Sequence, residues 1–181
     1  GGCGFIGSNF VNHIYDKLDC NIVNLDAMYY CASESNVRDD IRVSKRYTFV
    51  KGNLCSSDLV NHILSAHKID YVVHFAAQSH VDNSFSVPLQ YTHDNIVGTH
   101  TLLEGARIHG KIKKFIHVST DEVYGESMIE EAHKNENSIL CPTNPYAASK
   151  AGAELLAQSY YHSFKMPIII DRKSTRLNSS H

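Results

Sequence analysis

The sequence predicts an α/β fold with a doubly wound parallel sheet, because short β-branched runs alternate with helical patterns along most of the chain. A glycine-rich turn near the start opens a helix, which is typical of the first crossover in such a sheet. An aspartate at the end of the next strand is the second feature of a dinucleotide-binding unit. These three observations together indicate a Rossmann-like, NAD-binding domain.

The expected elements follow one another in a regular order. The first helix, at about Phe5–Leu18, follows the glycine turn, and a strand, "NIVNL", follows it. We expect strands at Asn21–Leu25, Tyr47–Lys51, Tyr71–Ala76, Lys114–Ser119 and Pro167–Ile170. The remaining helices are expected at about Asp58–His67, Leu89–His109 and Asn144–Phe164. Strands separated by helices of this length predict a parallel sheet that is covered on both faces.

Both ends of the chain depart from this pattern. The sequence begins inside the glycine turn, whereas such a turn normally follows the first, central strand of the sheet. We therefore expect a domain over residues 1–170 that lacks its first strand and the C-terminal substrate lobe, and that is inactive alone. Residues 171–181, "DRKSTRLNSSH", have no apolar periodicity. Their codons can be written as a widely used short-read sequencing adapter, so we interpret residues 171–181 as read-through that is not native.

The composition is that of an ordinary soluble, cytoplasmic protein, with 43% hydrophobic and 20% charged residues. The formal net charge of -2 gives no basic surface for nucleic acid, and no apolar run is long enough for a membrane span. The five cysteines show no CxxC pair, which favours reduced thiols. The twelve histidines form no HExxH or comparable set, so the sequence predicts no metal site.

The glycine turn and its acid predict a dinucleotide site. Gly1, Gly4 and Gly7 are spaced as G-x-x-G-x-x-G at the start of a helix. Glycines there let the backbone approach a pyrophosphate, which binds at the helix N-terminus. Asp26 follows nineteen positions after Gly7, at the end of "NIVNLD". An acid at that point accepts hydrogen bonds from the ribose hydroxyls and repels a 2′-phosphate, which favours NAD over NADP.

A tyrosine and a lysine share one face of the last predicted helix. In "NPYAASK", Tyr146 and Lys150 are four residues apart. A nearby ammonium group, together with a bound nicotinamide cation, stabilises phenolate over phenol. Tyr146, with an ordinary pKa of about 10, is thus expected to act as a base close to neutral pH.

Five features in this order resemble the extended short-chain dehydrogenase/reductase family. They are the glycine turn, the strand-end acid, "HFAAQSHVD", "STDEVYG" and "NPYAASK". Within that family they are most similar to the nucleoside-diphosphate-glucose 4,6-dehydratases, the dTDP-glucose type and its UDP-glucose relatives. The sister 4-epimerases resemble "SSATVYG" at the fourth feature, and the decarboxylases have a serine before the glutamate. The adjacent acids Asp121 and Glu122 therefore set this sequence apart.

The resemblance implies a lyase that dehydrates a nucleoside-diphosphate-glucose to the 4-keto-6-deoxy sugar. The substrate would be dTDP- or UDP-glucose, and hydride would be transferred internally through tightly bound NAD. The resemblance also implies that Tyr146, paired with Lys150, is the base for oxidation at C4. Glu122 would remove the C5 proton, and Asp121 would protonate the departing C6 hydroxyl. Elimination needs a base and an acid at different atoms, which explains two neighbouring carboxyl groups. Thr120 would hydrogen-bond the 4-hydroxyl of the substrate.

Further residues take roles from the resemblance alone. They are Phe5 and Ile6 at the dinucleotide turn, Asn53 and Leu54 near the adenine, Ala76 and Ala77 beneath the cofactor, and Ser79 against the substrate. Asn53 departs from the family, which usually has an aspartate there. We expect a homodimer in the full-length parent. A 4-epimerase or decarboxylase of the same family, and a non-catalytic dinucleotide-binding regulator, stay open as alternatives.

Overall fold

A computed structural model of the chain describes residues 1–126 and 134–172. Its strands are β1 (Ile22–Asp26), β2 (Tyr47–Lys51), β3 (Tyr71–His74), β4 (Lys114–Val118) and β5 (Ile168–Asp171). Its helices are α1 (Phe5–Lys17), α2 (Asp39–Arg42), α3 (Ser57–Ala66), α4 (Val81–Ser86), α5 (Pro88–Tyr91), α6 (Gly98–His109) and α7 (Pro145–Phe164). Two 3-10 turns, η1 (Glu34–Asn36) and η3 (Asp121–Tyr124), and a π-helical segment, η2 (Thr92–Val97), complete the described elements.

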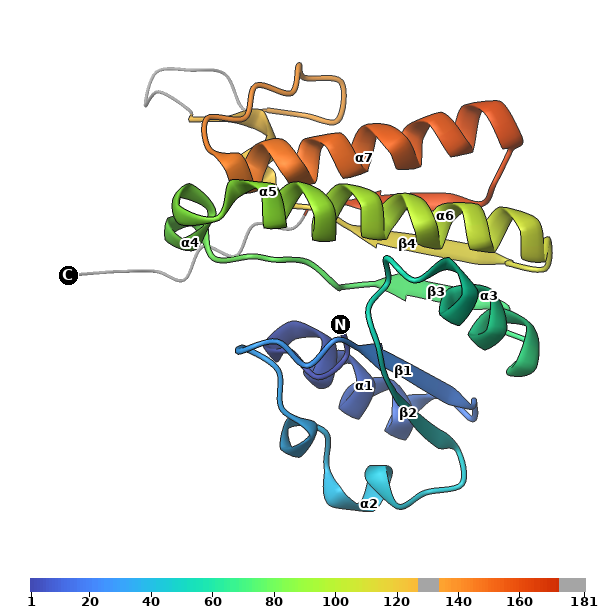
Figure 1. Cartoon of the computed structure of the whole chain (residues 1–181). Coiled ribbons are helices and arrows are strands. Elements are labelled where there is room, and N and C mark those ends of the chain that lie inside the picture. Colours follow the sequence, from blue (N-terminus) through green and yellow to red (C-terminus); the bar gives the residue numbers. More distant parts are fainter. Residues whose placement is uncertain (127–133, 173–181) are drawn as a thin grey trace.

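The described strands form two parallel sheets rather than one. β1 pairs with β2 over all five residues, and β4 pairs with β3 on one side and β5 on the other. No described strand joins the two sheets, and the β1 and β3 edges face each other (Figure 1). The order is that of a doubly wound sheet with one position unfilled, between β1 and β3. The predicted α/β class is therefore confirmed.

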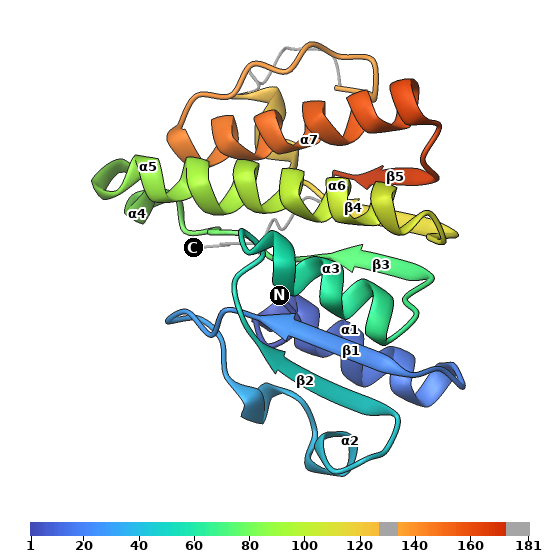
Figure 2. The ribbon, with the colours of Figure 1, turned by 45° about the vertical axis from the view of Figure 1, so that its right-hand side comes forward.

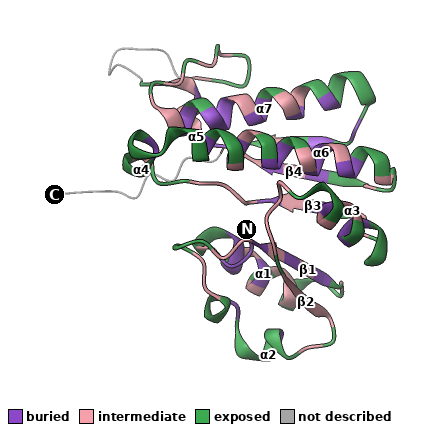
Figure 3. Ribbon diagram, in the orientation of Figure 1, coloured by how far each residue is buried: buried purple, intermediate pink, exposed green. Residues whose placement is uncertain are grey.

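Helices cover the sheets in separate groups. α6 and α7 lie side by side over the β3–β4–β5 sheet, and α3 packs beside α6 (Figure 2). Figure 3 shows buried residues along β1 and on the inner side of α7, where each meets its neighbours. Among the described helices, none combines the length and apolar character that crossing a membrane requires.

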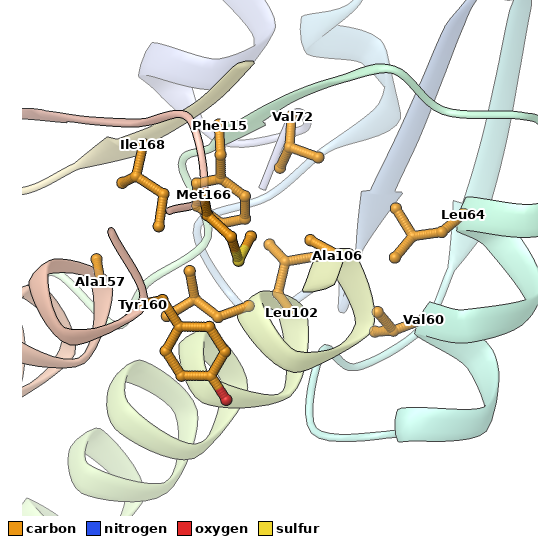
Figure 4. Close-up of a cluster of buried hydrophobic side chains, with 11 residues drawn as sticks. Val60, Leu64, Val72, Leu102, Ala106, Phe115, Ala157, Tyr160, Met166 and Ile168 are labelled. Carbon is orange, nitrogen blue, oxygen red and sulfur yellow. The ribbon is translucent and has the colours of Figure 1, made fainter. Parts of the chain in front are cut away.

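Two hydrophobic clusters hold these layers together. The larger one joins α3, α6 and α7 to the β3–β4–β5 sheet, with Leu103 and Phe115 fully buried within it (Figure 4). The smaller one joins α1 and α2 to β1, through Val11, Ile22 and Ile41. Each sheet thus has its own hydrophobic core. The shape of the space between the carboxyl ends of the two sheets therefore depends on the contacts that join the sheets.

The predicted elements are present, with shifted ends. β3 ends at His74 rather than Ala76, because the chain beyond His74 leaves the sheet and passes the glycine turn. The two segments are so close that a Cβ on Gly1 would lie 2.4 Å from the backbone nitrogen of Ala76. The predicted helix Leu89–His109 is present as one continuous helical run from Pro88 to His109, in which the π-helical η2 lies between α5 and α6. β5 continues to Asp171, so the predicted boundary after residue 170 falls inside a strand. Residues 173–181 lie outside the described residues.

Candidate active site

A cleft of about 590 Å³ lies at the carboxyl ends of β1, β3 and β4. This is the edge at which open parallel α/β sheets bind their ligands. Fifteen of the sixteen residues that the sequence singles out line it: Gly1, Gly4, Phe5, Ile6, Gly7, Asp26, Asn53, Leu54, Ala76, Ala77, Ser79, Thr120, Glu122, Tyr146 and Lys150. Asp121 is the exception, although it neighbours two lining residues. Segments far apart in the sequence therefore meet at one surface.

The glycine turn is shaped by close backbone contacts. A Cβ on Gly7 would lie 2.2 Å from the carbonyl oxygen of Gly1, so neither backbone could keep its position. Gly4 precedes α1 without a side-chain cap, which leaves the first N–H groups of the helix available to an anion. Phe5 is 82% exposed beside this turn. The arrangement fits a dinucleotide, because a bulkier turn would fill the space that a pyrophosphate needs.

Asp26 lies at the end of β1 and is buried. Its carboxylate accepts a hydrogen bond from the Cys3 backbone N–H at 2.9 Å and another from the Met28 backbone N–H at 2.8 Å. These contacts tie the glycine turn to the strand that carries the acid. Each carboxylate oxygen retains further acceptor capacity, so the predicted ribose contacts fit this geometry.

The loop after β2 forms another part of the cleft wall. Asn53 donates a hydrogen bond from Nδ2 to the Tyr29 hydroxyl at 2.9 Å, and its Oδ1 accepts from the Cys55 backbone N–H at 2.8 Å. Both ends of the amide are therefore engaged within the protein. Leu54 lines the cleft beside it.

The acidic pair lies in η3, directly after β4. Thr120 caps this turn: its hydroxyl oxygen accepts a hydrogen bond from the Glu122 backbone N–H at 3.3 Å. The Glu122 carboxylate accepts a hydrogen bond from Asn144 Nδ2 at 3.2 Å. The Asp121 carboxylate accepts one from the Thr120 hydroxyl at 3.4 Å. The two acids therefore have different partners, and only Glu122 lines the cleft.

Tyr146 and Lys150 lie on the buried side of the first turns of α7. Burial raises the pKa of Tyr146 to about 12, a hydrogen bond with Thr120 opposes the shift, and the charges of Glu122 and Asp121 add to it. Burial lowers the pKa of Lys150 to about 8, and Glu154 partly offsets this. The fold thus disfavours the charged form of both side chains.

The pKa of Tyr146 is raised in the protein without a cofactor, although Lys150 lies one turn away on α7. The expected lowering of this pKa also involves a bound nicotinamide cation and stays a prediction. The Lys150 ammonium instead donates to the Val118 carbonyl at 2.7 Å. Desolvation of the phenol outweighs any effect of the lysine, because the ring is buried against Tyr91.

A buried ion pair lies one turn below Lys150 on α7. Glu154 has no exposed surface and accepts hydrogen bonds from the Ser119 hydroxyl at 2.8 Å and from Arg172 Nε at 2.9 Å. Arg172 also donates to the Tyr124 hydroxyl at 2.5 Å. This network connects the ends of β4 and β5 to the helix that carries Tyr146 and Lys150.

Sequence reasoning missed two asparagines that position the site. Asn144 caps α7 by accepting from the Ala147 N–H at 2.8 Å and also contacts Glu122. Its place before a proline at the first helical position is a capping signal. Asn95, buried in η2, exchanges hydrogen bonds with the Gln78 backbone and donates to the Ser149 hydroxyl at 2.8 Å. No local pattern in the sequence marks Asn95, because its partners are 17 and 54 residues away.

The comparisons with known proteins agree with this geometry. The family model described as GDP-mannose 4,6 dehydratase matches residues 1–179. The dTDP-D-glucose 4,6-dehydratase of Dictyostelium discoideum is 48% identical over 182 residues, covering 95% of this chain and 42% of that protein. A trifunctional protein of Arabidopsis thaliana that includes UDP-glucose 4,6-dehydratase, RHM3, is 47% identical over 174 residues, covering 95% of this chain and 26% of that protein.

A solved structure extends the agreement to three dimensions. DesIV, a dTDP-glucose 4,6-dehydratase from Streptomyces venezuelae with NAD and TYD bound, superimposes with a TM-score of 0.87 at 38% identity, covering 95% of this chain and 53% of that one. The chain thus spans about half the length of the dehydratases of Dictyostelium and Streptomyces. The family match over residues 1–179 shows that the chain belongs to the nucleotide-sugar 4,6-dehydratase family, within the extended short-chain dehydrogenases/reductases.

Proposed function

We propose that this chain carries the NAD site and the catalytic groups of an enzyme that converts a nucleoside-diphosphate-glucose to its 4-keto-6-deoxy derivative. One observation carries the proposal. Thr120, Glu122, Tyr146 and Lys150 line the same cleft as the glycine turn and Asp26. A substrate held beside a dinucleotide in this cleft would meet a phenol, an ammonium group and a carboxylate together.

NAD, when bound, supplies a reversible acceptor for the hydrogen on C4 of the sugar and later returns it to C6. The residues of this chain that fit the cofactor are the glycine turn, with Phe5 and Ile6, and Asp26 for the ribose. Ala76 and Ala77, which line the cleft after β3, would lie beneath it. The loop with Asn53 and Leu54 would meet the adenine.

Tyr146 is the proposed base for the C4 hydroxyl, and Thr120 is the proposed hydrogen-bonding partner of that hydroxyl. Because burial and two nearby carboxylates oppose a phenolate at this position, Tyr146 needs positive charge in the cleft before it can accept the role. Lys150 is the buried cation closest in sequence to it. Its ammonium, held at the Val118 carbonyl, is placed along the same face of α7.

Glu122 is the proposed base for the C5 proton, and Asp121 the proposed acid for the departing C6 hydroxyl. A ketone at C4 acidifies the hydrogen on C5, so a carboxylate suffices to remove it. The Asn144 amide, 3.2 Å from Glu122 Oε2, orients that carboxylate. Asp121 does not line the cleft, so its proposed role requires its side chain to turn inward when the substrate binds.

The proposal can be tested with Glu122→Gln in a full-length enzyme in which this chain replaces the matching segment of the Dictyostelium relative. We expect substrate to reduce the bound cofactor as before, while elimination stalls and the absorbance of NADH persists. Turnover should fall by about 10²–10⁴-fold.

Two controls accompany that variant. Glu126→Gln changes an exposed glutamate outside the cleft and should leave turnover unchanged. Tyr146→Phe should prevent the first reduction, so no NADH absorbance appears. Normal turnover by Glu122→Gln would show that Glu122 is not the C5 base.

A further inference from the structure

Three side chains with different metal-binding atoms meet near the loop after β2. Cys55, His93 and Asp94 each offer one ligand atom, and all three atoms lie within 4.8 Å of one another. Cys55 comes from the segment between β2 and α3, whereas His93 and Asp94 are adjacent in the π-helical η2. Because 38 residues separate Cys55 from His93, no spacing pattern in the sequence reveals the group.

Two of the three distances between these atoms match those of a tetrahedral zinc site. The Cys55 sulfur lies 3.6 Å from His93 Nδ1, and His93 Nδ1 lies 3.4 Å from Asp94 Oδ1. In a tetrahedron with ordinary zinc bond lengths, a sulfur and a nitrogen ligand are about 3.6 Å apart, and a nitrogen and an oxygen ligand about 3.3 Å. Two edges of the coordination tetrahedron are thus already formed.

Hydrogen bonds from outside the group hold Asp94 in a suitable orientation. Its Oδ2 accepts from Gln78 Nε2 at 2.9 Å and from Gln90 Nε2 at 2.8 Å. The other oxygen, Oδ1, is left facing His93. Partners of this kind, which fix a ligand without touching the ion, commonly support metal sites.

Cys55 is positioned in a similar way. The Asn53 side chain accepts a hydrogen bond from the Cys55 backbone N–H at 2.8 Å, which fixes the loop that carries the thiol. Without an ion, the thiol can donate to His93 Nδ1 or to the His93 carbonyl oxygen, which also lies 3.6 Å from the sulfur. Ion binding would replace this weak contact and release the thiol proton to solvent.

We propose that Cys55, His93 and Asp94 form a binding site for a zinc-class divalent cation at the edge of the cleft. The ion would take one sulfur, one nitrogen and one oxygen ligand from the chain, and water in the fourth position. It would join the loop after β2 to η2. Since Asp94 and Asn53 both line the cleft, the ion would also fix the wall that the proposed function assigns to the adenine.

The test measures binding of Zn²⁺ by competition with a chromophoric chelator, and of Co²⁺ by the absorption band that a thiolate ligand produces. We expect one ion per chain in the unmodified protein. Cys55→Ser and His93→Gln should abolish the site. Gln90→Ala, which removes one support of Asp94, should weaken binding by about 10–100-fold.

Matched controls separate this site from incidental binding by other side chains. Cys141→Ser changes an exposed cysteine, and His62→Gln changes an exposed histidine, both outside the cluster. Both control variants should bind the ion as tightly as the unmodified protein does. Each measurement is made on the full-length chimera with the Dictyostelium relative, with circular dichroism as the check of folding. The proposal would be overturned if Cys55→Ser bound the ion as tightly as the unmodified chimera does. It would also be overturned if the control variants lost as much ion binding as Cys55→Ser and His93→Gln.

Discussion

At the scale of single residues, burial acts on Tyr146 and Lys150 in opposite directions. It raises the pKa of the phenol to about 12 and lowers the pKa of the ammonium to about 8, because both charged forms lose hydration. Positive charge in the cleft would favour the phenolate. The role proposed for Tyr146 as a base therefore calls for such a charge beside it.

Asp26 gives a prediction about cofactor preference. Its carboxylate is buried and held by two backbone N–H groups, so it cannot swing away from a ligand in the cleft. A 2′-phosphate close to it would meet a like charge. We expect the folded enzyme to bind NAD at least about tenfold more tightly than NADP, a difference of about 1.4 kcal/mol. Calorimetric titration of both dinucleotides measures this preference.

Two variants complete the experiment on Asp26. Asp26→Asn should narrow the gap between the dinucleotides, because it removes the repulsion. Asp58→Asn, at an exposed position on α3, should leave the preference as it is. Equal affinity of the unmodified protein for NAD and NADP would remove Asp26 from the ribose site.

At the scale of elements, two histidines lie on the neighbouring strands β3 and β4. His74 and His117 are buried, with ring centroids 5.4 Å apart. Among the described residues, neither ring nitrogen of His117 has a hydrogen-bond partner. Burial, together with the charge of Lys150, lowers the pKa of His117 to about 3, and burial lowers the pKa of His74 as well. Both imidazoles are therefore held neutral by the fold.

This pair predicts a loss of stability toward acid. The pKa of His117 in the folded state lies below its value of about 6.5 in the unfolded state. At pH values between these two, the unfolded state binds more protons than the folded state does. The free energy of unfolding should therefore fall as the pH drops below about 6.5, by up to about 1.4 kcal/mol per pH unit for each histidine. Denaturant titrations of the full-length chimera between about pH 5 and 6.5, above most carboxyl pKa values, measure this contribution.

The replacement His117→Leu should make the pH dependence shallower, because it removes one of the two protonation sites. His67→Leu, at an exposed position, should leave the slope unchanged. If His117→Leu showed the same slope as the unmodified protein, protonation of His117 would not be coupled to unfolding.

Patterns within one element were predictable from the sequence, and contacts between elements were not. The glycine spacing, the Tyr146–Lys150 face and the strands themselves follow from local periodicity and turn chemistry. The π-helical turn η2 within the helix after residue 88 has no local signal, and it contains Asn95, which is buried, and Asp94, which lies near Cys55. The raised pKa of Tyr146 likewise depends on burial by segments far away in the sequence.

At the scale of the whole molecule, the unfilled position between β1 and β3 separates the two sheets. The facing edges carry backbone groups without strand partners, and unpaired edges favour aggregation. The glycine turn lies between these edges, where Gly1 approaches Ala76 closely. The part of the cleft proposed to bind the cofactor and the part proposed to carry catalysis are therefore held together without a strand that joins the two sheets.

We expect the 181-residue chain alone to unfold without cooperativity or to aggregate, and to bind NAD weakly. The net stability of a domain is only about 5–15 kcal/mol, and two unpaired inner edges should remove much of it. A version with an apolar strand supplied ahead of Gly1 should unfold cooperatively and bind NAD. Chemical denaturation and NAD titration of both versions test this.

Shortening the chain after Arg172 serves as the control, since it keeps the ion pair with buried Glu154. We expect it to change neither property. Cooperative unfolding and tight NAD binding by the unmodified chain would show that the junction is stronger than its contacts indicate.

The proposed dehydration is tested most directly by analysing the products that the full-length chimera forms from dTDP-glucose and UDP-glucose. Mass spectrometry and nuclear magnetic resonance distinguish a 4-keto-6-deoxy sugar, which has lost water, from a 4-epimer, which has the mass of the substrate. We predict the 4-keto-6-deoxy sugar, formed without added reductant or oxidant and lost in Glu122→Gln. A 4-epimer, a decarboxylated product from a nucleotide-linked sugar acid, or no product from a folded, NAD-loaded protein would contradict the account.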